Sequence, residues 1–416
     1  MQRDRLWPIW LFYAYIISLS ISPAVFTDPN DNRNYLLIFC MGIGFFGYLL
    51  MGKIQPRKDS TLLLIMILTI FIQGLFHFHS TRWSSIFFTC MFFFYYMVGL
   101  RLAKKCGATY ESLYRICRGI IVAYFLVLLL QQICVLFGFP VINSTRDMSM
   151  MSSQWKLNSL SSEPSHTGRF VGILMYSCIN AQFRIVKRSL TLKESYKLDR
   201  KLWLTFLWIE LTTISGTAMI ILAIIMTIFL SKRNIILFIS IIGVIFCVGL
   251  ISNITALRRA TTFLLAVAGG NPELMMVADH SASTRIVPVL LCIFRLNPLS
   301  LGSWIGEGSG TIGKWLSQYM PGVPEGYIGG GIAAYAVECG LLVASLFISF
   351  SYRCCYDSKH KIPSIGLWIM CVLLIGINSQ IGWLCMTMLY LDKNLDKLVS
   401  KTNDIGQSKK LPCIVI

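Results

Sequence analysis

Long apolar runs are the feature that most constrains this chain. They recur from near residue 7 to residue 391, and a helix that crosses a bilayer needs about 20 predominantly apolar residues. Charged residues make up only 13% of the 416 residues, against about 25% in soluble domains. The sequence therefore predicts an all-α, polytopic membrane helix bundle that forms a single integral membrane domain over 1–416.

Twelve windows of this sequence are apolar enough to be transmembrane helices. The window 364–391 is compatible with one long tilted helix, but the polar cluster Asn378, Ser379 and Gln380 is typical of a turn and favours two helices. The predicted windows are 7–26, 35–52, 61–78, 84–102, 119–139, 168–183, 201–214, 217–230, 235–252, 327–350, 364–377 and 380–391.

Lysine and arginine are distributed unevenly over the connections between these windows. Most of the 37 basic residues fall on the side of the N-terminus, and cytoplasmic loops carry such an excess. We therefore expect both termini to be cytoplasmic. The net charge of +18 is then mainly a topology signal, so it does not indicate nucleic acid as a partner.

Two long connections lie on the opposite, outer side, at 140–167 and 253–326. Long loops in compact proteins are usually functional or disordered. The second contains the apolar segments TTFLLAVAGG and RIVPVLLCIFRL, which predict amphipathic helices at the outer membrane surface. An alternative is that 286–301 enters the membrane. In either case the sequence predicts that the protein functions at its outer face.

The excess of basic residues in cytoplasmic loops does not explain why arginines occur on the outer side. They either extend along apolar surface with the charged end in water, or bind phosphate through the planar guanidinium. Arg285 is the best candidate for phosphate binding, because the glycine-rich run LGSWIGEGSGTIG follows it. Glycines such as Gly302 and Gly306 let a backbone approach a ligand closely, although a flexible hinge is equally compatible. The outer arginines in this set are Arg169, Arg258, Arg259, Arg285 and Arg295.

A second group of candidates lies in SSEPSHTGRF, at the start of the sixth window. Pro164 is typical of a first helical position, so Glu163 either caps this helix or acts as a general base next to an apolar wall. His166 is a candidate for the same base or for a hydrogen bond to substrate. His280 is a similar candidate, and for both histidines a polar packing role is the alternative.

Polar residues inside the apolar windows supply one more hypothesis. Glu210 lies within an apolar run, where an ionisable residue indicates function. Together with Asn378 and Gln380 it lines an outward-open cavity in one interpretation, and it forms interhelical hydrogen bonds in the other. The 14 cysteines show no metal-ligand spacing, so we expect neither a metal site nor a disulfide framework.

Four segments of the sequence resemble bacterial O-antigen polymerases of the Wzy type, within the superfamily of O-antigen polymerases and ligases. SSEPSHTG begins a span after an outer loop, and TISGT marks a tight outer turn. NPLSLGSWIGEGSG follows Arg285 in the large outer loop, and AYAVECGLLVASLFISF places Glu338–Gly340 early in the next span.

This resemblance implies a multi-pass glycosyltransferase of the bacterial inner membrane that needs no metal or other cofactor. Its substrates are oligosaccharide repeat units linked to undecaprenyl pyrophosphate, which it joins at the periplasmic face. The lipid bilayer and a protein that regulates chain length are the implied partners. Outer arginines, Arg285 first and Arg258 second, would stabilise the pyrophosphate leaving group, while Glu163 or a histidine activates the acceptor hydroxyl.

Two other functions remain as alternatives. The related O-antigen ligases carry a loop histidine at a fixed distance before a G-x-x-x-G, and Cys292 occupies that place before Gly302 and Gly306, which favours a polymerase. A flippase or transporter of lipid-linked oligosaccharides would need charges inside the bundle and short loops. The sequence also shows no clear internal repeat of the kind that many transporters have.

Overall fold

The computed structural model describes residues 3–23, 34–50, 58–143, 157–213, 215–230, 255–278, 280–320 and 329–407. These residues are mostly helical and contain no β-strand, which confirms the predicted all-α class. The predicted window 235–252 lies outside the described residues. Every other predicted window has a helical counterpart, although the boundaries differ.

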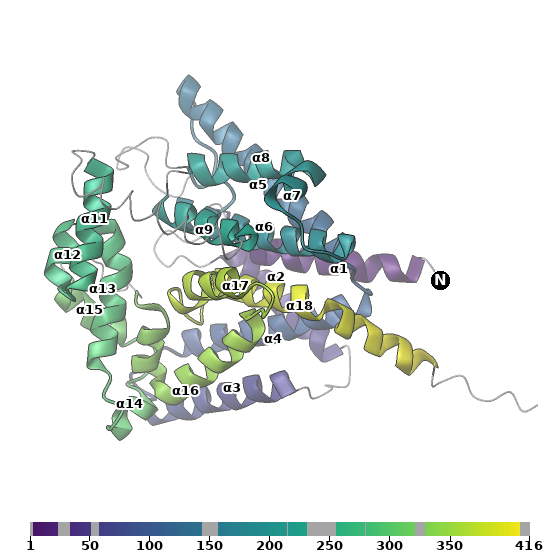
Figure 1. Cartoon of the computed structure of the whole chain (residues 1–416). Helices are drawn as coiled ribbons and strands as arrows, with labels where there is room; N and C mark the ends of the chain where they lie inside the picture. The colour runs from purple at the N-terminus through teal and green to yellow at the C-terminus, as the bar shows by residue number, and fades with distance from the viewer. Residues whose placement is uncertain are drawn as a thin grey trace, which may run out of the picture.

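The helices are labelled in Figure 1. They are α1 (Arg3–Ser20), α2 (Tyr35–Leu50), α3 (Lys58–Phe76), α4 (Trp83–Lys105), α5 (Tyr110–Phe137), α6 (Pro164–Val186), α7 (Leu192–Leu198), α8 (Arg200–Thr212), α9 (Gly216–Met226), the 3₁₀ turn η3 (Thr227–Phe229), α11 (Thr255–Ala268), α12 (Pro272–Ala278), α13 (His280–Arg295), α14 (Leu301–Ile305), α15 (Ile312–Tyr319), α16 (Gly331–Cys355), α17 (Lys361–Trp368), the π-helical turn η4 (Ile369–Leu373) and α18 (Gln380–Gln407).

Three of the described helices are long and apolar enough to cross a membrane. They are α4, α5 and α16. Shorter apolar helices lie at Pro8–Ser20, Tyr35–Phe46, Thr61–Phe76, Gly216–Phe229 and Lys361–Leu373. The predicted break near Asn378 is present, since η4 ends at Leu373 and α18 begins at Gln380.

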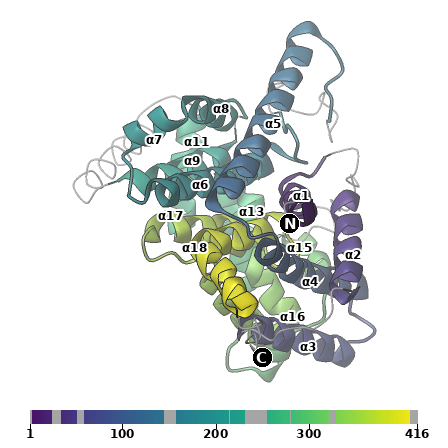
Figure 2. The same ribbon diagram turned by 90° about the vertical axis from the view of Figure 1, so that its right-hand side faces the viewer.

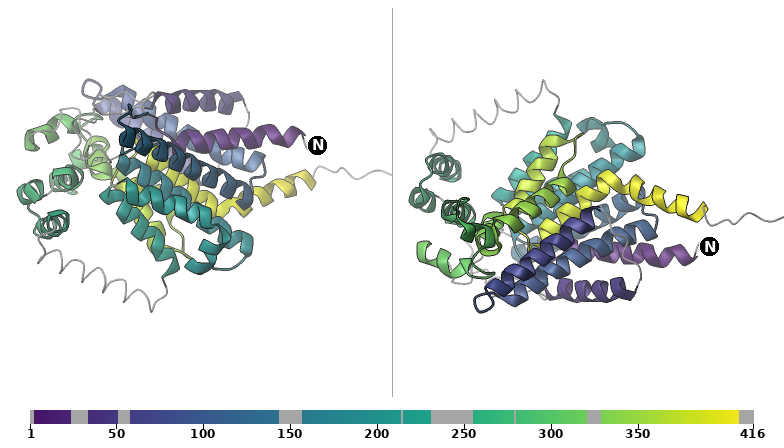
Figure 3. Two further views of the ribbon diagram at one scale, coloured as in Figure 1. Left: turned by 90° about the horizontal axis from the view of Figure 1, so that it is seen from above. Right: turned by 90° about the horizontal axis from the view of Figure 1, so that it is seen from below.

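The segment 253–326, predicted to be a large outer loop, forms a separate layer of helices. Figure 1 shows α11, α12, α13 and α15 across one end of the bundle, roughly perpendicular to its long helices, with the N-terminus at the other end. The two views of Figure 3 show the same arrangement. The described part of this segment is therefore helical and lies at the end of the bundle opposite to the N-terminus.

The helix α6 occupies the centre of the molecule. Figure 2 shows it among α5, α8, α9, α17 and α18, and every residue from Thr167 to Phe183 is buried. It starts at Pro164 rather than at residue 168, because proline fits the first helical turn, where its missing N–H is not needed. This central helix fixes the position of the residues at both of its ends.

The helix α16 is interrupted at Gly340, which has non-helical angles of φ 85° and ψ 157°. The backbone of Gly306 packs against this break: a Cβ on Gly306 would lie 2.5 Å from the carbonyl oxygen of Glu338 and 2.5 Å from the nitrogen of Gly340. The amide of Gly308 donates to the Glu338 carbonyl at 2.9 Å. Two glycines thus allow α14 and its following turn to pack closely against α16.

Candidate active site

A network of short polar side chains orders the segment that leads into α6. Asn158 donates to the carbonyl oxygens of Asn143 and Ser161 at 3.0 and 2.6 Å. The Ser159 hydroxyl donates to the Tyr124 carbonyl at 2.6 Å, which fixes the segment to α5. In irregular segments, asparagine and serine side chains form hydrogen bonds with backbone groups that have no helix or sheet partner. The start of α6 therefore has a defined geometry.

Glu163 occupies the N-cap position of α6 but its side chain does not cap the helix. Its backbone is extended, with φ −142° and ψ 152°, and its carboxylate accepts no hydrogen bond from the first-turn amides. The hydroxyl of Ser165 donates to Oε2 at 3.3 Å. The prediction that this side chain caps the helix is therefore wrong. The half-buried carboxylate lies at the positive end of the α6 dipole.

His166 lies one turn into α6, on the same half-buried rim as Glu163. Its Nδ1 is 2.9 Å from the hydroxyl of Ser162. This contact orients the imidazole ring. Glu163 and His166 are therefore neighbours at the same helix start, as the sequence predicted.

Arg169 is the deepest charged residue of this group. Its side chain is only 6% exposed, and its Nε has no hydrogen-bond partner in the described part of the chain. Both Glu163 and Arg285 lie close enough to interact with it electrostatically. Arg169 therefore lies within electrostatic range of both the start of α6 and the helix α13.

Arg285 reaches this group from α13. Its Nη1 donates to the hydroxyl of Thr217 at 2.9 Å, and Thr217 is buried at the start of α9. Thr217 belongs to the TISGT motif, which sequence analysis interpreted only as a turn. The structure thus brings Glu163, Arg169 and Arg285 together from segments more than 100 residues apart.

Two guanidinium groups of like charge lie close together at this point. Among the residues that the structure describes, neither Arg169 nor Arg285 forms an ion pair with a carboxylate. Arg169 is buried whereas Arg285 is exposed, and a buried charge is costly unless it is paired. A doubly charged anion such as a phosphate or pyrophosphate would relieve this repulsion, because guanidinium matches phosphate oxygens.

Glu210 lies behind this site and does not reach its surface. It is fully buried, and neither carboxylate oxygen has a hydrogen-bond partner in the described part of the chain. A Cβ on Gly168 would lie 3.0 Å from Oε2 of Glu210, so the lack of a side chain on Gly168 leaves space for this carboxyl group. Asn378 and Gln380 lie elsewhere, bonded to Thr89 and Asn34. The hypothesis that these three residues line one open cavity is therefore wrong.

Arg295 and the two predicted glycines have contacts within the protein instead. Arg295 forms two 2.8 Å hydrogen bonds with Glu307 and lies 4.4 Å above the Trp315 ring. Gly306 packs on the α16 break, whereas Gly302 is exposed in α14. The structure does not bring these residues to the pair of arginines.

Three further candidates are described by their backbone alone. Arg258 and Arg259 lie in α11, and His280 begins α13; their side chains lie outside the described part of the structure. No group of three or more His, Cys, Asp or Glu residues suited to a metal ion occurs among the described residues.

Comparisons with known proteins add no relative. No protein-family model matches the chain, and no curated protein or solved structure matches it either.

Proposed function

We propose that this protein is an O-antigen polymerase. In this proposal it spans the bacterial inner membrane twelve times, with both termini in the cytoplasm. It joins oligosaccharide repeat units carried on undecaprenyl pyrophosphate at the periplasmic face. The observation that supports this most directly is the pair of guanidinium groups of Arg169 and Arg285, next to Glu163 and His166.

The reaction is a glycosyl transfer. The acceptor hydroxyl oxygen attacks the anomeric carbon of the donor glycan, and the bond from that carbon to the pyrophosphate oxygen breaks. The electron pair leaves with the lipid pyrophosphate, while the hydroxyl proton passes to Glu163 or His166. Arg169 and Arg285 stabilise the charge that develops on the leaving group, and such preorganised charge is usually the largest contribution to catalysis. General-base catalysis adds typically 10²–10⁴-fold.

The arrangement of the helices is consistent with this orientation. The candidate site lies where α13 meets the starts of α6 and α9, and α13 belongs to the layer at the end away from the N-terminus (Figure 1). If the N-terminus is cytoplasmic, as the charge bias predicts, this layer is periplasmic. Exposed apolar side chains on α5, such as Leu130 and Leu136, would contact lipid tails.

An O-antigen ligase remains the closest alternative, and Cys292 is the residue that weighs against it. Cys292 is fully buried in α13, and a Cβ on Gly330 would lie 3.3 Å from its sulfur. A buried thiol behaves as a small apolar residue. It therefore cannot replace the loop histidine that ligases carry at this place.

A transporter of lipid-linked oligosaccharides is a second alternative, because interrupted helices such as α16 occur in transporters. In those proteins the interruption lines a cavity. Here the break at Gly340 is filled by the backbone of Trp304 and Gly306. This packing favours a structural role for the interruption.

Complementation of a polymerase-deficient strain tests the proposal, with lipopolysaccharide examined on a gel. The wild-type chain should restore a ladder of polymers, whereas Arg285→Ala and Arg169→Ala should leave single repeat units at normal expression. Arg295→Ala is the matched control, because this arginine is paired with Glu307 away from the site, and it should keep the ladder. A full ladder from both site variants would refute the assignment. Loss of all O-antigen in the deficient strain would indicate a flippase or ligase instead.

A further inference from the structure

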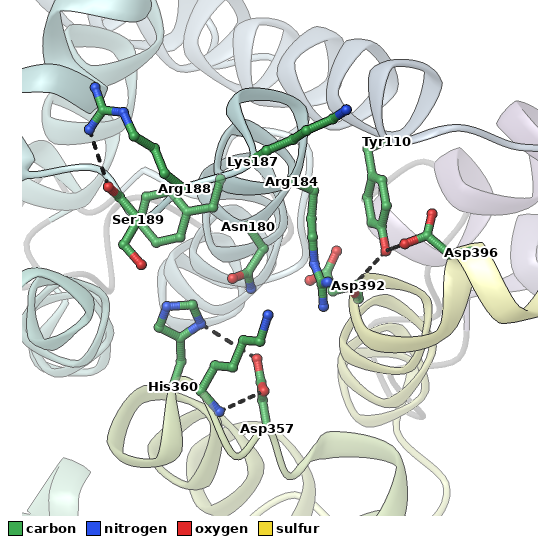
Figure 4. A pocket seen from close by; sticks show the side chains of 12 residues that line it. Tyr110, Asn180, Arg184, Lys187, Arg188, Ser189, Asp357, His360, Asp392 and Asp396 are labelled. Carbon is green, nitrogen blue, oxygen red and sulfur yellow. Dashed lines mark hydrogen bonds and ion pairs between the residues drawn. The ribbon is translucent and has the colours of Figure 1, made fainter.

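A polar cavity of about 790 Å³ lies at the opposite end of α6 from the candidate active site. It is formed by the end of α6, the connection between α16 and α17, and α18 (Figure 4). Arg169 and Asn180, the residues of the two sites that come nearest along α6, are three helical turns apart, or about 17 Å. The cavity is therefore separate from the catalytic proposal, and with a cytoplasmic N-terminus it faces the cytoplasm.

Charges of both signs line this cavity. The basic side chains are Arg184, Lys187, Arg188 and Lys359, and the acidic side chains are Asp357, Asp392 and Asp396. A ligand with several negative charges and no positive charge would meet three carboxylates here. A purely cationic ligand would meet four basic groups. The lining instead matches a ligand that carries both charges.

Several of these groups already have partners. Asp357 lies 3.5 Å from the Nδ1 of His360, and Asp396 accepts a hydrogen bond from the Tyr110 hydroxyl at 3.2 Å. Arg188 is paired with Glu194 at 2.8 Å. These contacts hold the rim of the cavity in place.

Asp392 and Asn180 lie close to each other in the wall of the cavity. The Oδ1 of Asp392 and the Nδ2 of Asn180 form no hydrogen bond in the described part of the chain, although the two residues are only 4% and 5% exposed. The other oxygen of Asp392 accepts from Ser177 at 2.9 Å. Figure 4 shows Asn180 directed into the cavity. Buried polar groups are almost always hydrogen-bonded, so a polar ligand group placed between this acceptor and this donor would satisfy both.

A smaller groove of about 260 Å³ adjoins the cavity and shares Arg188 with it, and Glu194 and Lys197 also line this groove. Its apolar wall consists of Val186, Leu190 and Leu198. Val186 and Leu198 are exposed, and an alkyl chain would cover them. A groove with an apolar wall next to a polar cavity fits an amphiphile better than a soluble metabolite.

We propose that this cavity binds the headgroup of a zwitterionic phospholipid of the phosphatidylethanolamine class. Arg184, Lys187 and Lys359 bind the phosphate, and the carboxylate of Asp392 accepts hydrogen bonds from the ammonium. One acyl chain lies along the Val186–Leu198 groove. Basic pockets at the cytoplasmic surface are known to bind lipid headgroups, and the buried Asp392 makes this pocket selective for a headgroup that also carries a positive charge.

Lipid titration of the purified, delipidated full chain tests this proposal. Binding of phosphatidylethanolamine, phosphatidylglycerol and water-soluble glycerophosphoethanolamine is measured by native mass spectrometry. The wild-type chain should bind phosphatidylethanolamine about tenfold more tightly than phosphatidylglycerol, since one buried charge pair is lost with the latter. Glycerophosphoethanolamine should bind more weakly than the lipid with the same headgroup, because it lacks the chain that fills the groove.

Three variants localise the site. Asp392→Asn should abolish the preference between the two lipids, and Lys359→Gln, at an exposed position, should weaken binding of both. Arg115→Gln is the control, because this exposed arginine does not line the cavity, and it should bind as the wild type does. Equal affinity of the wild-type chain for both lipids overturns the proposal, as does unchanged binding by Lys359→Gln. If Asp392→Asn does not fold, the lipid binding of Lys359→Gln still tests the proposal. Equal affinity for glycerophosphoethanolamine would show that a soluble phosphoethanolamine is the ligand and would overturn the lipid assignment.

Discussion

The guanidinium of Arg285 donates a hydrogen bond to the hydroxyl of Thr217 at 2.9 Å, which connects α13 to the start of α9. Thr217 is buried, whereas Arg285 is exposed. The threonine therefore positions the arginine and is itself shielded from solvent. The TISGT motif acquires a specific role from this contact, since it supplies the acceptor that directs Arg285 toward Arg169.

Thr217→Val should reduce polymerisation about tenfold, because it removes this acceptor and leaves the side-chain volume almost unchanged. Thr217→Ser keeps the hydroxyl and should retain most of the activity. Chain-length distributions in the complemented strain measure both variants, with protein levels checked by immunoblot. Equal loss of activity in the valine and serine variants would show that only packing matters at this position.

Arg169→Gln should lower the activity of the protein without lowering its stability. The guanidinium of Arg169 is buried next to another arginine, so replacing it removes like-charge repulsion and the cost of a buried charge. We expect polymerisation to fall by 10²-fold or more while the apparent Tm of the purified protein stays the same or rises. A lower Tm together with the lost activity would indicate that Arg169 has a structural role instead.

Part of the site was predictable from the sequence for a physical reason. Pro164 marks a helix start, and the distribution of basic residues places 140–167 and 253–326 on one side, so Glu163 and Arg285 were expected at the same face. Thr217 was not predicted, because a hydrogen bond across 68 residues depends on how α9 and α13 pack. Arg295 was counted as available to phosphate, since its pairing with Glu307 depends on how the turn after α14 packs back against the end of α13.

Gly306 also shows how far the sequence can predict a site. Its glycine-rich run predicted that the backbone approaches a ligand closely, whereas in the structure the backbone of Gly306 approaches the protein's own backbone at Glu338–Gly340. Sequence composition indicates that a backbone needs room or a positive φ. It does not identify the group that occupies the space.

Gly306→Ala should therefore destabilise the protein by about 2 kcal/mol or more. Its φ is +88°, and a Cβ would lie 2.5 Å from the Glu338 carbonyl. Gly302→Ala is the matched control: it lies in the same run, and the nearest atom to its Cβ would be the Ser300 hydroxyl at 3.5 Å. Thermal unfolding in detergent compares the two. An unaltered Tm for Gly306→Ala would contradict the packing described at the α16 break.

Asp199 predicts a pH dependence on the opposite side of the protein from the candidate active site. It caps α8 by accepting from the Leu202 amide at 2.9 Å, and it also binds the Tyr114 hydroxyl and the Arg118 guanidinium at 2.7 and 2.6 Å. Burial raises the pKa of Asp199, but these three donors outweigh it and hold the pKa below its ordinary value of 3.8.

A carboxylate with a lowered pKa stabilises the folded state fully above its unfolded pKa, and this contribution is lost as the pH falls through the folded value. Asp199→Asn should therefore lower the apparent Tm by about 2–4 °C at pH 7, and its difference from the wild type should shrink as the pH falls below 3.8. Glu111→Gln is the control, since its 3.9 Å contact with Arg115 is exposed and contributes little. A difference between Asp199→Asn and the wild type that stays constant down to the lowest accessible pH would show that the ionised carboxylate is not what connects α5 to α8.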